Sequence, residues 1–411
     1  MKKLFSRNFT LVVIGQIISL FGNATIRFAL PLYLLNQTGS SALYGTVTAC
    51  AFIPMIVLSP VGGIAADRVN KRNVMVVLDF FTAGVIVMFS LLVGSVNLVL
   101  LMTVTLMLLY GIAGAYQPSV QASVPALVHA EHILEANSVI NTISAFSNLL
   151  GPVLGGLVYS TYGLKPVLWV CMVCFFLSAV MELFSHIPYE KRAYDGSVWR
   201  MVRADFAQSI GFIRREKPVI GKAVFVICGV NLFLSSMIIV SLPYMITQVL
   251  QLDPAQASWM YGFAQGILAA GGLTGGIGAG ILAKKLTLQK AGNLIVICAL
   301  CVFPMGITLI LFSSGIVNYI VLTASCFVIM VCSTIFSVEM MAFVQEQTPQ
   351  ELVGRVIAVM LTICMCAQPL GNAFYGVFFE ICRGCESVVF LFAGAVSLLI
   401  AMGAKRVFYK L

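Results

Sequence analysis

Long apolar runs alternate with short polar stretches along the whole chain. Each run has about 20 residues or more, the length that a helix needs to cross the hydrocarbon core of a bilayer. A β-barrel would show segments of about ten residues with alternating polarity, and the runs do not alternate in this way. The pattern predicts twelve transmembrane helices, with approximate cores at 9–35, 42–65, 74–94, 97–117, 133–159, 166–186, 219–248, 257–282, 291–312, 317–341, 354–379 and 387–404.

The longest polar stretch, 188–218, divides the twelve runs into six and six. We expect two six-helix bundles, residues 1–188 and 219–411, joined by a cytoplasmic linker at 189–218. In the linker, apolar residues at helical spacing lie opposite basic ones and predict an amphipathic helix at the inner membrane surface. A helix that only joins the bundles is the simpler interpretation. The apolar positions are Trp199, Val202, Phe206, Ile210 and Ile213.

Composition agrees with an all-α integral membrane protein. Apolar residues make up 60% of the 411 residues, compared with roughly 45–50% in soluble domains. Lys2 and Lys3 precede the first apolar run, as in a signal peptide. The run continues past Arg27 to Leu35, however, which is too long for a signal sequence, so we expect an uncleaved first span.

The basic residues predict the orientation in the membrane. If the chain crosses twelve times, 21 of the 24 Lys and Arg residues lie on the side that holds both termini. Positive loops stay cytoplasmic, so we expect both termini inside a cell membrane. The net charge of +9 then records topology and attraction to the anionic headgroups of the bilayer, and no nucleic-acid partner is expected.

Ten of the twelve cysteines lie within predicted spans, where thiols pack as small apolar groups. The other two, Cys382 and Cys385, form a C-x-x-C sequence in a predicted outer loop. A disulfide or a metal site is possible there, but no second C-x-x-C or nearby histidine completes a zinc set. We predict no metal site and no cofactor.

The two halves carry similar segments. ALPLYLL at 29–35 is similar to SLPYMI at 241–246, GIAADR at 63–68 to GILAKK at 280–285, and the segment that starts at Pro125 to TPQELVGR at 348–355. The three offsets are 212, 217 and 218 residues. Repeated six-helix halves are typical of transporters that rock two bundles around a central site, and neither an enzyme nor a receptor needs them.

The loop after the second predicted span reads G-x-x-x-D-R-x-x-K-R and resembles the signature loop of the major facilitator superfamily. The matching residues are Gly63, Asp67, Arg68, Lys71 and Arg72. The resemblance implies two pseudo-symmetric six-helix bundles, with Asp67 latching them together in the outward-facing state.

Topology alone explains the basic residues of this loop, but it does not explain Gly63 and Asp67. Asn70 stands where the family has glycine, a replacement that is tolerable because asparagine also adopts left-handed backbone conformations. Asp79 is expected to pair with Arg68 or Arg72 and so to support the latch. The second-half copy has Lys284 in the position of Asp67 and is expected to lack a latch.

A second motif concerns the direction of transport. GPVLGG, with Gly151, Pro152, Gly155 and Gly156, resembles the G-P-x-x-G-G motif of antiporters in the superfamily. Small residues let helices approach closely, and proline removes a helical hydrogen bond. Such small-residue patterns also serve ordinary helix packing, so the motif favours an exporter without proving one.

The whole chain is most similar to the drug–proton antiporter branch that contains macrolide-efflux permeases, the branch of multidrug resistance. The segments that carry this resemblance are 21–41, 117–137 and 345–356. It implies proton-coupled efflux of a lipophilic or amphipathic small molecule. Related branches export siderophores or flip lysophospholipids, and these stay open as alternatives.

Ionisable residues inside a span are costly and therefore mark functional candidates. Arg27 could hold a substrate anion, with a structural ion pair as the alternative. Glu339 could take up and release a proton, or its carboxylate could reach the inner surface. Asn23 stands where relatives often have Asp, which weakens a proton-carrying role at that position. Other polar residues that could line a cavity include Gln16, Asn148 and Asn231.

The sequence contains no phosphate-binding G-x-x-x-x-G-K-[ST] motif, so ATP does not drive this transport directly. We predict a monomeric secondary transporter and not an enzyme. Its partners are a small-molecule substrate, held between the bundles, and protons as the coupling ion. A polytopic membrane enzyme and a non-transporting sensor are the rivals from other classes. An enzyme would require a cluster of histidine or carboxylate residues at one membrane face, which the chain lacks.

Overall fold

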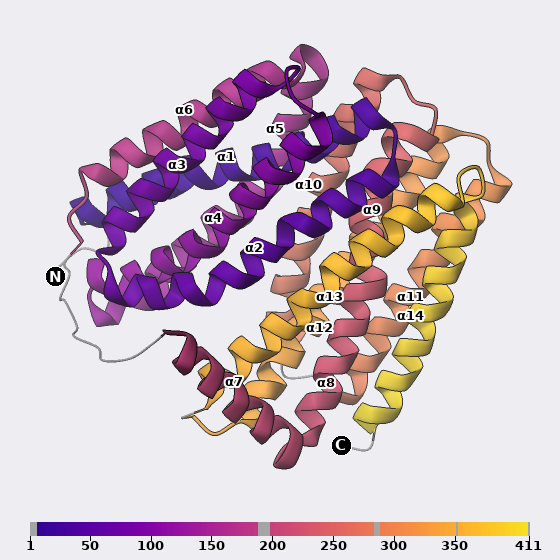
Figure 1. Ribbon diagram of the computed structural model, residues 1–411. Coiled ribbons are helices and arrows are strands. Elements are labelled where there is room, and N and C mark those ends of the chain that lie inside the picture. The colour runs from indigo at the N-terminus through magenta and orange to yellow at the C-terminus, as the bar shows by residue number, and fades with distance from the viewer. Residues whose placement is uncertain (1–5, 188–197, 283–287, 351, 410–411) are drawn as a thin grey trace. The chain divides into compact units, whose positions relative to one another are not determined.

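A computed structural model describes residues 6–187, 198–282, 288–350 and 352–409. All regular structure in these residues is helical, and twelve helices have the length and composition to cross a membrane. The predicted all-α membrane fold with twelve spans is therefore confirmed. Figure 1 shows the helices, whose bounds are α1 Arg7–Thr38, α2 Ser41–Arg68, α3 Lys71–Leu92, α4 Leu98–Leu127, α5 Ile133–Tyr162, α6 Leu164–Leu183, α7 Val198–Arg215, α8 Pro218–Gly229, α9 Ser236–Tyr244, α10 Pro254–Leu282, α11 Leu288–Leu311, α12 Gly315–Gln347, α13 Val353–Ile381 and α14 Glu386–Tyr409.

Short polar residues set the ends of several spans. The side-chain oxygens of Asn70 and Asn97 accept backbone hydrogen bonds at the starts of α3 and α4, which satisfies N–H groups that a helix leaves free. Gly163 ends α5 with a φ of 77°, a conformation that favours glycine. The seventh span is a composite, because α8 and α9 are joined by the π-helical segment η2 (Val230–Ser235) and α9 continues into η3 (Met245–Val249).

The chain forms two compact units. Unit 1 contains Met1–Gln37, Cys50–Val198 and Pro254–Gly266, and unit 2 contains Thr38–Ala49, Trp199–Asp253 and Ile267–Leu411. Each unit therefore includes the first residues of one span from the other half of the sequence. The exchanged segments are the start of α2, in unit 2, and the start of α10, in unit 1.

Glycines permit both exchanged segments to pack. In unit 2, a Cβ on Gly376 of α13 would lie 2.7 Å from the Ser41 carbonyl oxygen and 2.9 Å from the Cα of Gly45 in α2. In unit 1, a Cβ on Gly262 of α10 would lie 2.5 Å from the Pro152 carbonyl oxygen and 3.1 Å from the Cα of Gly156. No side chain fits at either crossing, so backbone contacts backbone.

The linker helix α7 belongs to unit 2, and Figure 1 shows it near the start of α8. The predicted linker thus contains a helix, Val198–Arg215, while its cytoplasmic side and its place at the membrane surface stay predictions. The side chain that anchors it, however, is Phe212, which is buried in a cluster with Ile220 of α8 and Val356 of α13. Ile210, predicted for the apolar face, is 39% exposed. The side chains of Trp199 and Val202 lie outside the described part.

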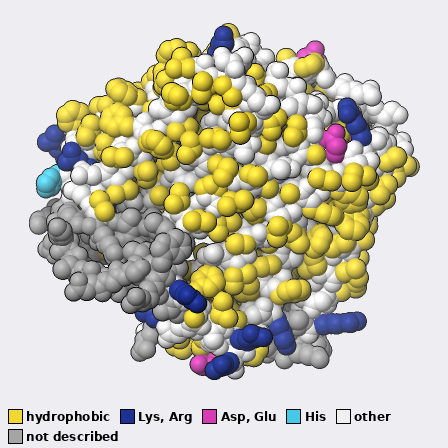
Figure 2. Space-filling model, viewed as in Figure 1, with side chains coloured by type: hydrophobic (Ala, Val, Ile, Leu, Met, Phe, Trp, Pro, Cys, Tyr) yellow, Lys and Arg dark blue, Asp and Glu magenta, His cyan; other side chains and the backbone are white. Residues whose placement is uncertain are grey.

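Exposed apolar side chains cover much of the helical surface, as expected where lipid replaces water. Phe225 is 80% exposed and Ile281 is 75% exposed. Figure 2 shows hydrophobic side chains across most of the visible face, with Lys and Arg gathered near its lower edge. The chain is a multi-pass membrane protein.

Candidate functional site

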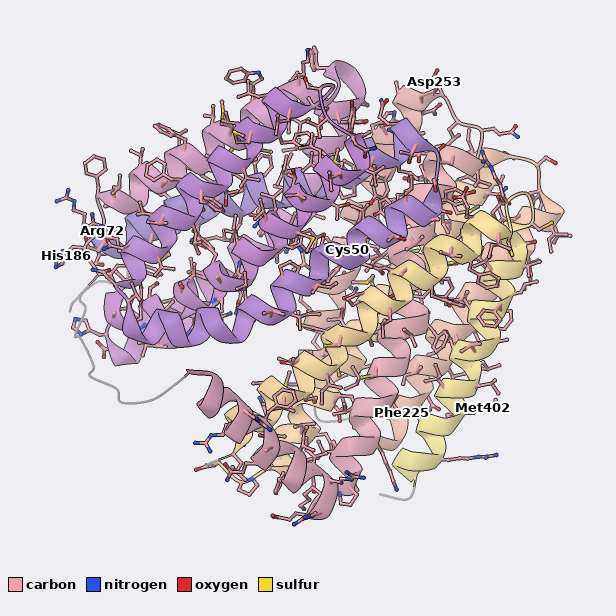
Figure 3. The ribbon with its side chains drawn as sticks, viewed as in Figure 1. Cys50, Arg72, His186, Phe225, Asp253 and Met402 are labelled. Carbon is pink, nitrogen blue, oxygen red and sulfur yellow. The ribbon has the colours of Figure 1, made fainter. Side chains whose placement is uncertain are left out.

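The signature-like loop joins the end of α2 to the start of α3. Gly63, Asp67 and Arg68 lie in α2, but their side chains are outside the described part, and the predicted latch therefore stays a prediction. Lys71 and Arg72 form the first turn of α3. Figure 3 labels Arg72 and His186 toward the same end of unit 1.

Asn70 does not adopt a left-handed conformation. Its φ is −58° and its ψ is 111°, and its side-chain oxygen accepts a hydrogen bond of 3.1 Å from the backbone N–H of Arg72. Asparagine therefore replaces the family's glycine here by acting as an N-cap and not by adopting a left-handed conformation. The loop therefore turns without any positive φ at this position.

Asp79 lies deep in unit 1, where only 2% of its surface is exposed. Its Oδ1 accepts a hydrogen bond of 3.0 Å from the Ser19 hydroxyl of α1. Among the described side chains, no basic group pairs with this carboxylate. The expected pairing with Arg72 is therefore not present in this conformation, while the side chain of Arg68 is outside the described part.

Three further side chains extend this polar region. Gln16 of α1 donates from Nε2 to the hydroxyl of Tyr116 on α4. The same Nε2 lies 3.4 Å from Glu182 Oε1 on α6, and the Tyr116 hydroxyl donates to that oxygen at 2.8 Å. We call Gln16, Ser19, Asp79, Tyr116 and Glu182 the buried polar cluster; it joins α1, α3, α4 and α6, and none of its members is more than 5% exposed.

Sequence reasoning found only part of this cluster. Gln16 was predicted as a cavity residue and Asp79 as part of the latch, whereas Tyr116 carried no signal, since tyrosine is ordinary in spans. Glu182 stands out in the sequence as an acidic residue near the end of an apolar run. Its helical spacing with Ser178, four residues earlier, could have marked a polar face on α6. The Ser178 hydroxyl donates to the Gly15 carbonyl of α1 at 3.0 Å.

Replacing Tyr116 with phenylalanine is expected to destabilise the protein by about 1–3 kcal/mol, because Glu182 and Gln16 lose a buried hydrogen-bond partner. Thermal unfolding of the purified protein in detergent measures the effect. Tyr162→Phe is the control, since Tyr162 is 72% exposed, and a change within about 0.5 kcal/mol is expected there. Equal melting temperatures for the two variants would contradict the assigned contacts.

The GPVLGG motif lies where α5 contacts two other helices of unit 1. A Cβ on Gly151 would lie 2.6 Å from the Cβ of Ala24 on α1, and one on Gly155 would lie 3.0 Å from the methyl group of Thr25. The Pro152 carbonyl and Gly156 contact Gly262 of α10. The motif therefore supplies close helix packing on two sides, as its small residues predict.

Arg27 of α1 lies over the ring of Tyr110 on α4, with its guanidinium carbon 3.6 Å from the ring centroid. Among the described residues no carboxylate forms an ion pair with it. The ion-pair alternative is therefore not supported in this conformation, and a cation–π contact holds the side chain instead. The guanidinium N–H groups remain available for a polar ligand.

The other predicted cavity residues do not gather at one place in a single unit. Asn23 in unit 1 is half-buried and Asn148 is exposed, while Glu339 in unit 2 is half-buried. Asn231 has a packing role, because its Nδ2 donates to the Cys364 carbonyl of α13 at 3.0 Å. This bond ties the π-helical segment η2 to α13.

The C-x-x-C sequence at Cys382 and Cys385 lies just after α13. Both sulfurs are free, so no disulfide joins them in this structure. The backbone N–H of Cys385 donates to the Cys382 carbonyl at 2.8 Å, which makes the pair part of a tight turn. The two cysteines therefore shape the connection to α14.

A large apolar cavity lies in unit 2, among α7, α8, α13 and α14. Its volume is about 990 Å³, and its wall includes Phe225, Phe233, Ile363 and Leu399. Phe225 is labelled on α8 in Figure 3. Two basic residues, Arg214 and Lys222, are the charged members of the wall. A cavity of this size and character suits a bulky apolar ligand.

Comparison with protein families gives one match over most of the chain. The model of the Major Facilitator Superfamily matches residues 12–372. Among curated proteins, macrolide efflux protein A of Streptococcus pyogenes is 22% identical over 393 residues, which cover 94% of this chain and 93% of that protein. The multidrug efflux pump Tap of Mycolicibacterium fortuitum is also 22% identical, over 85% of this chain and 84% of its own length.

Solved transporter structures share the fold. A bacterial homologue of the iron transporter ferroportin, in an inward-facing state, aligns with a TM-score of 0.72 at 17% identity over 98% of each chain. The nucleoside transporter NupG aligns with a TM-score of 0.74 at 14% identity, over 98% of this chain and 100% of that one. At these identities the likeness concerns the fold alone.

Proposed function

Because the chain belongs to the major facilitator superfamily and is therefore a transporter and not an enzyme, we propose that it exports a lipophilic or amphipathic small molecule by alternating access. The apolar cavity of unit 2 is the observation that carries this proposal. Apart from Arg214 and Lys222, the wall is largely apolar and includes Phe225, Phe233 and Leu399, so it favours solutes that partition into the bilayer.

We propose that inward proton movement drives the export. The macrolide and multidrug efflux relatives support this direction at low identity, and the close helix packing of GPVLGG is consistent with an antiporter. Glu339 is the carboxyl that the sequence suggests for proton transfer. Arg27 is proposed to hold a polar group of the substrate, because its guanidinium has no carboxylate partner among the described residues.

The membrane setting follows from the charge distribution. We propose that the protein lies in the cell membrane as a monomer, with both termini in the cytoplasm, since the basic residues gather on that side of the predicted topology. The latch proposal keeps Asp67 as the residue that joins the bundles in the outward-facing state. Gly63 then permits the approach, and Lys71 and Arg72 supply the positive end of the loop.

A lysophospholipid or another amphiphile with an anionic head is the second candidate. Arg214 and Lys222 favour it, because two basic side chains lie in an otherwise apolar wall. An acyl chain would occupy the apolar part, and the headgroup would meet the basic pair. A cationic macrolide gains nothing from these two charges.

The full-length protein in proteoliposomes with an imposed pH gradient tests the proposal. Gradient-driven flux of erythromycin or ethidium is expected, with a loss in Arg27→Ala. The same rate of flux with and without the pH gradient would exclude proton coupling. Flux of lysophosphatidylglycerol alone would replace the drug-like substrate by the second candidate, and normal gradient-driven flux in Glu339→Gln would remove Glu339 from the mechanism.

Narrowing the cavity is expected to slow export. Ala367→Phe places a ring in the cavity wall on α13, and we expect the rate at limiting substrate to fall about tenfold, the effect of losing roughly 1.4 kcal/mol of binding. The matched control is Val377→Phe, on the same helix, at a position that is 45% exposed and outside the cavity. An unchanged rate in Ala367→Phe would show that substrate does not use the cavity.

A further inference from the structure

The buried polar cluster holds two carboxyl groups without a counter-charge. Asp79 and Glu182 are 2% and 0% exposed, and among the described residues neither forms an ion pair. Burying a carboxylate without a cation costs several kcal/mol per ion. A fold that keeps two of them in one bundle therefore requires something that neutralises the charge.

The hydrogen bonds of the cluster show what is missing. The Gln16 amide nitrogen donates hydrogen bonds to Tyr116 and Glu182. The Tyr116 hydroxyl donates to Glu182, and the Ser19 hydroxyl donates to Asp79. All the donors are therefore used. The atoms left without a partner are three buried acceptors, namely Gln16 Oε1, Asp79 Oδ2 and Glu182 Oε2. A bound proton, a cation or another hydrogen-bond donor would satisfy them.

Charged groups on the helices that form the cluster lie elsewhere along those helices. Arg72 precedes Asp79 by two helical turns and lies in the first turn of α3, toward one end of unit 1 (Figure 3). Lys165 is in the first turn of α6, some 17 residues before Glu182. The remaining titratable or charged groups on these four helices are Arg7, Arg27, Tyr33, Lys71, Tyr110, Cys171 and Cys174.

We propose that Asp79 and Glu182 together form the proton-binding site of this transporter, a proposal that rests on the proposed proton-coupled export. A proton that binds a carboxylate oxygen removes a buried charge and supplies one of the missing donors. It later leaves from the same oxygen, and no other bond changes. Gln16 and Tyr116 position Glu182, and Ser19 positions Asp79.

Tight packing links the protonation of this site to the arrangement of the helices. A Cβ on Gly15 of α1 would lie 3.2 Å from Glu182 Cγ, so α1 and α6 touch beside the carboxyl group. When the protons leave, two like charges remain in a space that excludes water, and the helices must separate to admit solvent. Loss of the proton therefore favours a different packing of α1 against α3 and α6.

Infrared spectroscopy of the full-length protein in proteoliposomes tests the site without any substrate. We expect the carbonyl band of a buried, protonated carboxyl group, shifted in D₂O, and its loss in the double variant Asp79→Asn/Glu182→Gln. Glu346→Gln is the control, because Glu346 is exposed, and it should retain the band. A wild-type protein without the band would overturn the proposal, as would Na⁺ raising the melting temperature of the wild type but not of the double variant.

Transport assays separate this proposal from the proposed function. With erythromycin as probe, we expect gradient-driven export by the double variant to fall at least tenfold. Wild-type flux that does not depend on the gradient would refute the proposed function. Gradient-driven wild-type flux that survives in the double variant would refute the proton site alone. The melting temperature of the double variant shows whether it folds.

Discussion

Replacing Gly262 with alanine is expected to destabilise the protein by about 1–3 kcal/mol, as overpacking of a close-packed contact does. At an exposed helix position, the same substitution would stabilise the protein by about 0.8–1 kcal/mol, because alanine favours the helix more than glycine does. Destabilisation by Gly262→Ala would therefore indicate the close contact. A Cβ at this position would lie 2.5 Å from the Pro152 carbonyl oxygen. Backbone atoms cannot rotate away, and α10 must therefore move off α5.

Thermal unfolding in detergent measures this effect, and the same helix provides the control. A Cβ on Gly276 of α10 would have no neighbouring atom within 4 Å, so Gly276→Ala should be neutral or stabilising. The equivalent crossing in unit 2 should respond like Gly262, because a Cβ on Gly45 would clash with the Asn372 carbonyl oxygen. Stabilisation by Gly262→Ala or Gly45→Ala would mean that these helices do not cross so closely.

Replacing Glu380 with alanine is expected to cost about 1–2 kcal/mol, the effect of losing a helix cap. Its Oε2 accepts hydrogen bonds from the hydroxyls of Ser40 and Ser41, at 2.9 and 3.3 Å, and from the Ala42 N–H at 3.3 Å. The carboxylate thus lies at the amino end of α2, where the helix dipole favours negative charge. Unfolding in urea or by heat measures the loss.

Glu380→Gln separates the shape of this cap from its charge. A glutamine oxygen can still accept these hydrogen bonds, so we expect at most half of the loss seen with alanine, and the difference should shrink in high salt. If Glu380→Ala were as stable as wild type, the three contacts would contribute nothing to holding α2 against α13. Glu386 also binds a backbone N–H, that of Gly384, but in a different turn, and it is left unchanged in both variants.

The fold was predictable because lipid imposes a simple rule on sequence. Apolar runs of sufficient length must become helices, and all twelve did. The composite seventh span was not predictable, since its π-helical turns at η2 and η3 depend on contacts such as Asn231 with α13. The exchange of the starts of α2 and α10 between the units was not predictable either. A glycine in a membrane helix indicates close packing, but it does not indicate which helix packs against it.

The candidate site was predictable only for its ionisable residues, because such residues are rare within the apolar spans. Acidic residues within spans stand out, but the hydrogen bonds of Asp79 with Ser19 and of Glu182 with Tyr116 depend on how the helices pack. The conformation of Asn70 could not be predicted, because asparagine is compatible both with a left-handed turn and with an N-cap. Arg27 was recognised, yet its contact with Tyr110 depends on how α1 crosses α4.

The glycine crossings also preserve the internal repeat. Gly45 and Gly262 are 217 residues apart, the offset that separates GIAADR from GILAKK, and Gly156 and Gly376 are 220 apart. Each crossing contains one glycine from each half of the sequence. Gly45 contacts Gly376 in one crossing, and their counterparts Gly262 and Gly156 contact each other in the other crossing. Nearly equal offsets are expected if a six-helix ancestor was duplicated with its packing intact.

The apolar cavity is lined only by residues of unit 2, while the buried polar cluster belongs wholly to unit 1. Substitutions that reshape the cavity therefore leave the donors and acceptors of the cluster unaltered. Because the two features lie in separate units, the residues that line the cavity can change in evolution while the hydrogen bonds of the cluster stay the same.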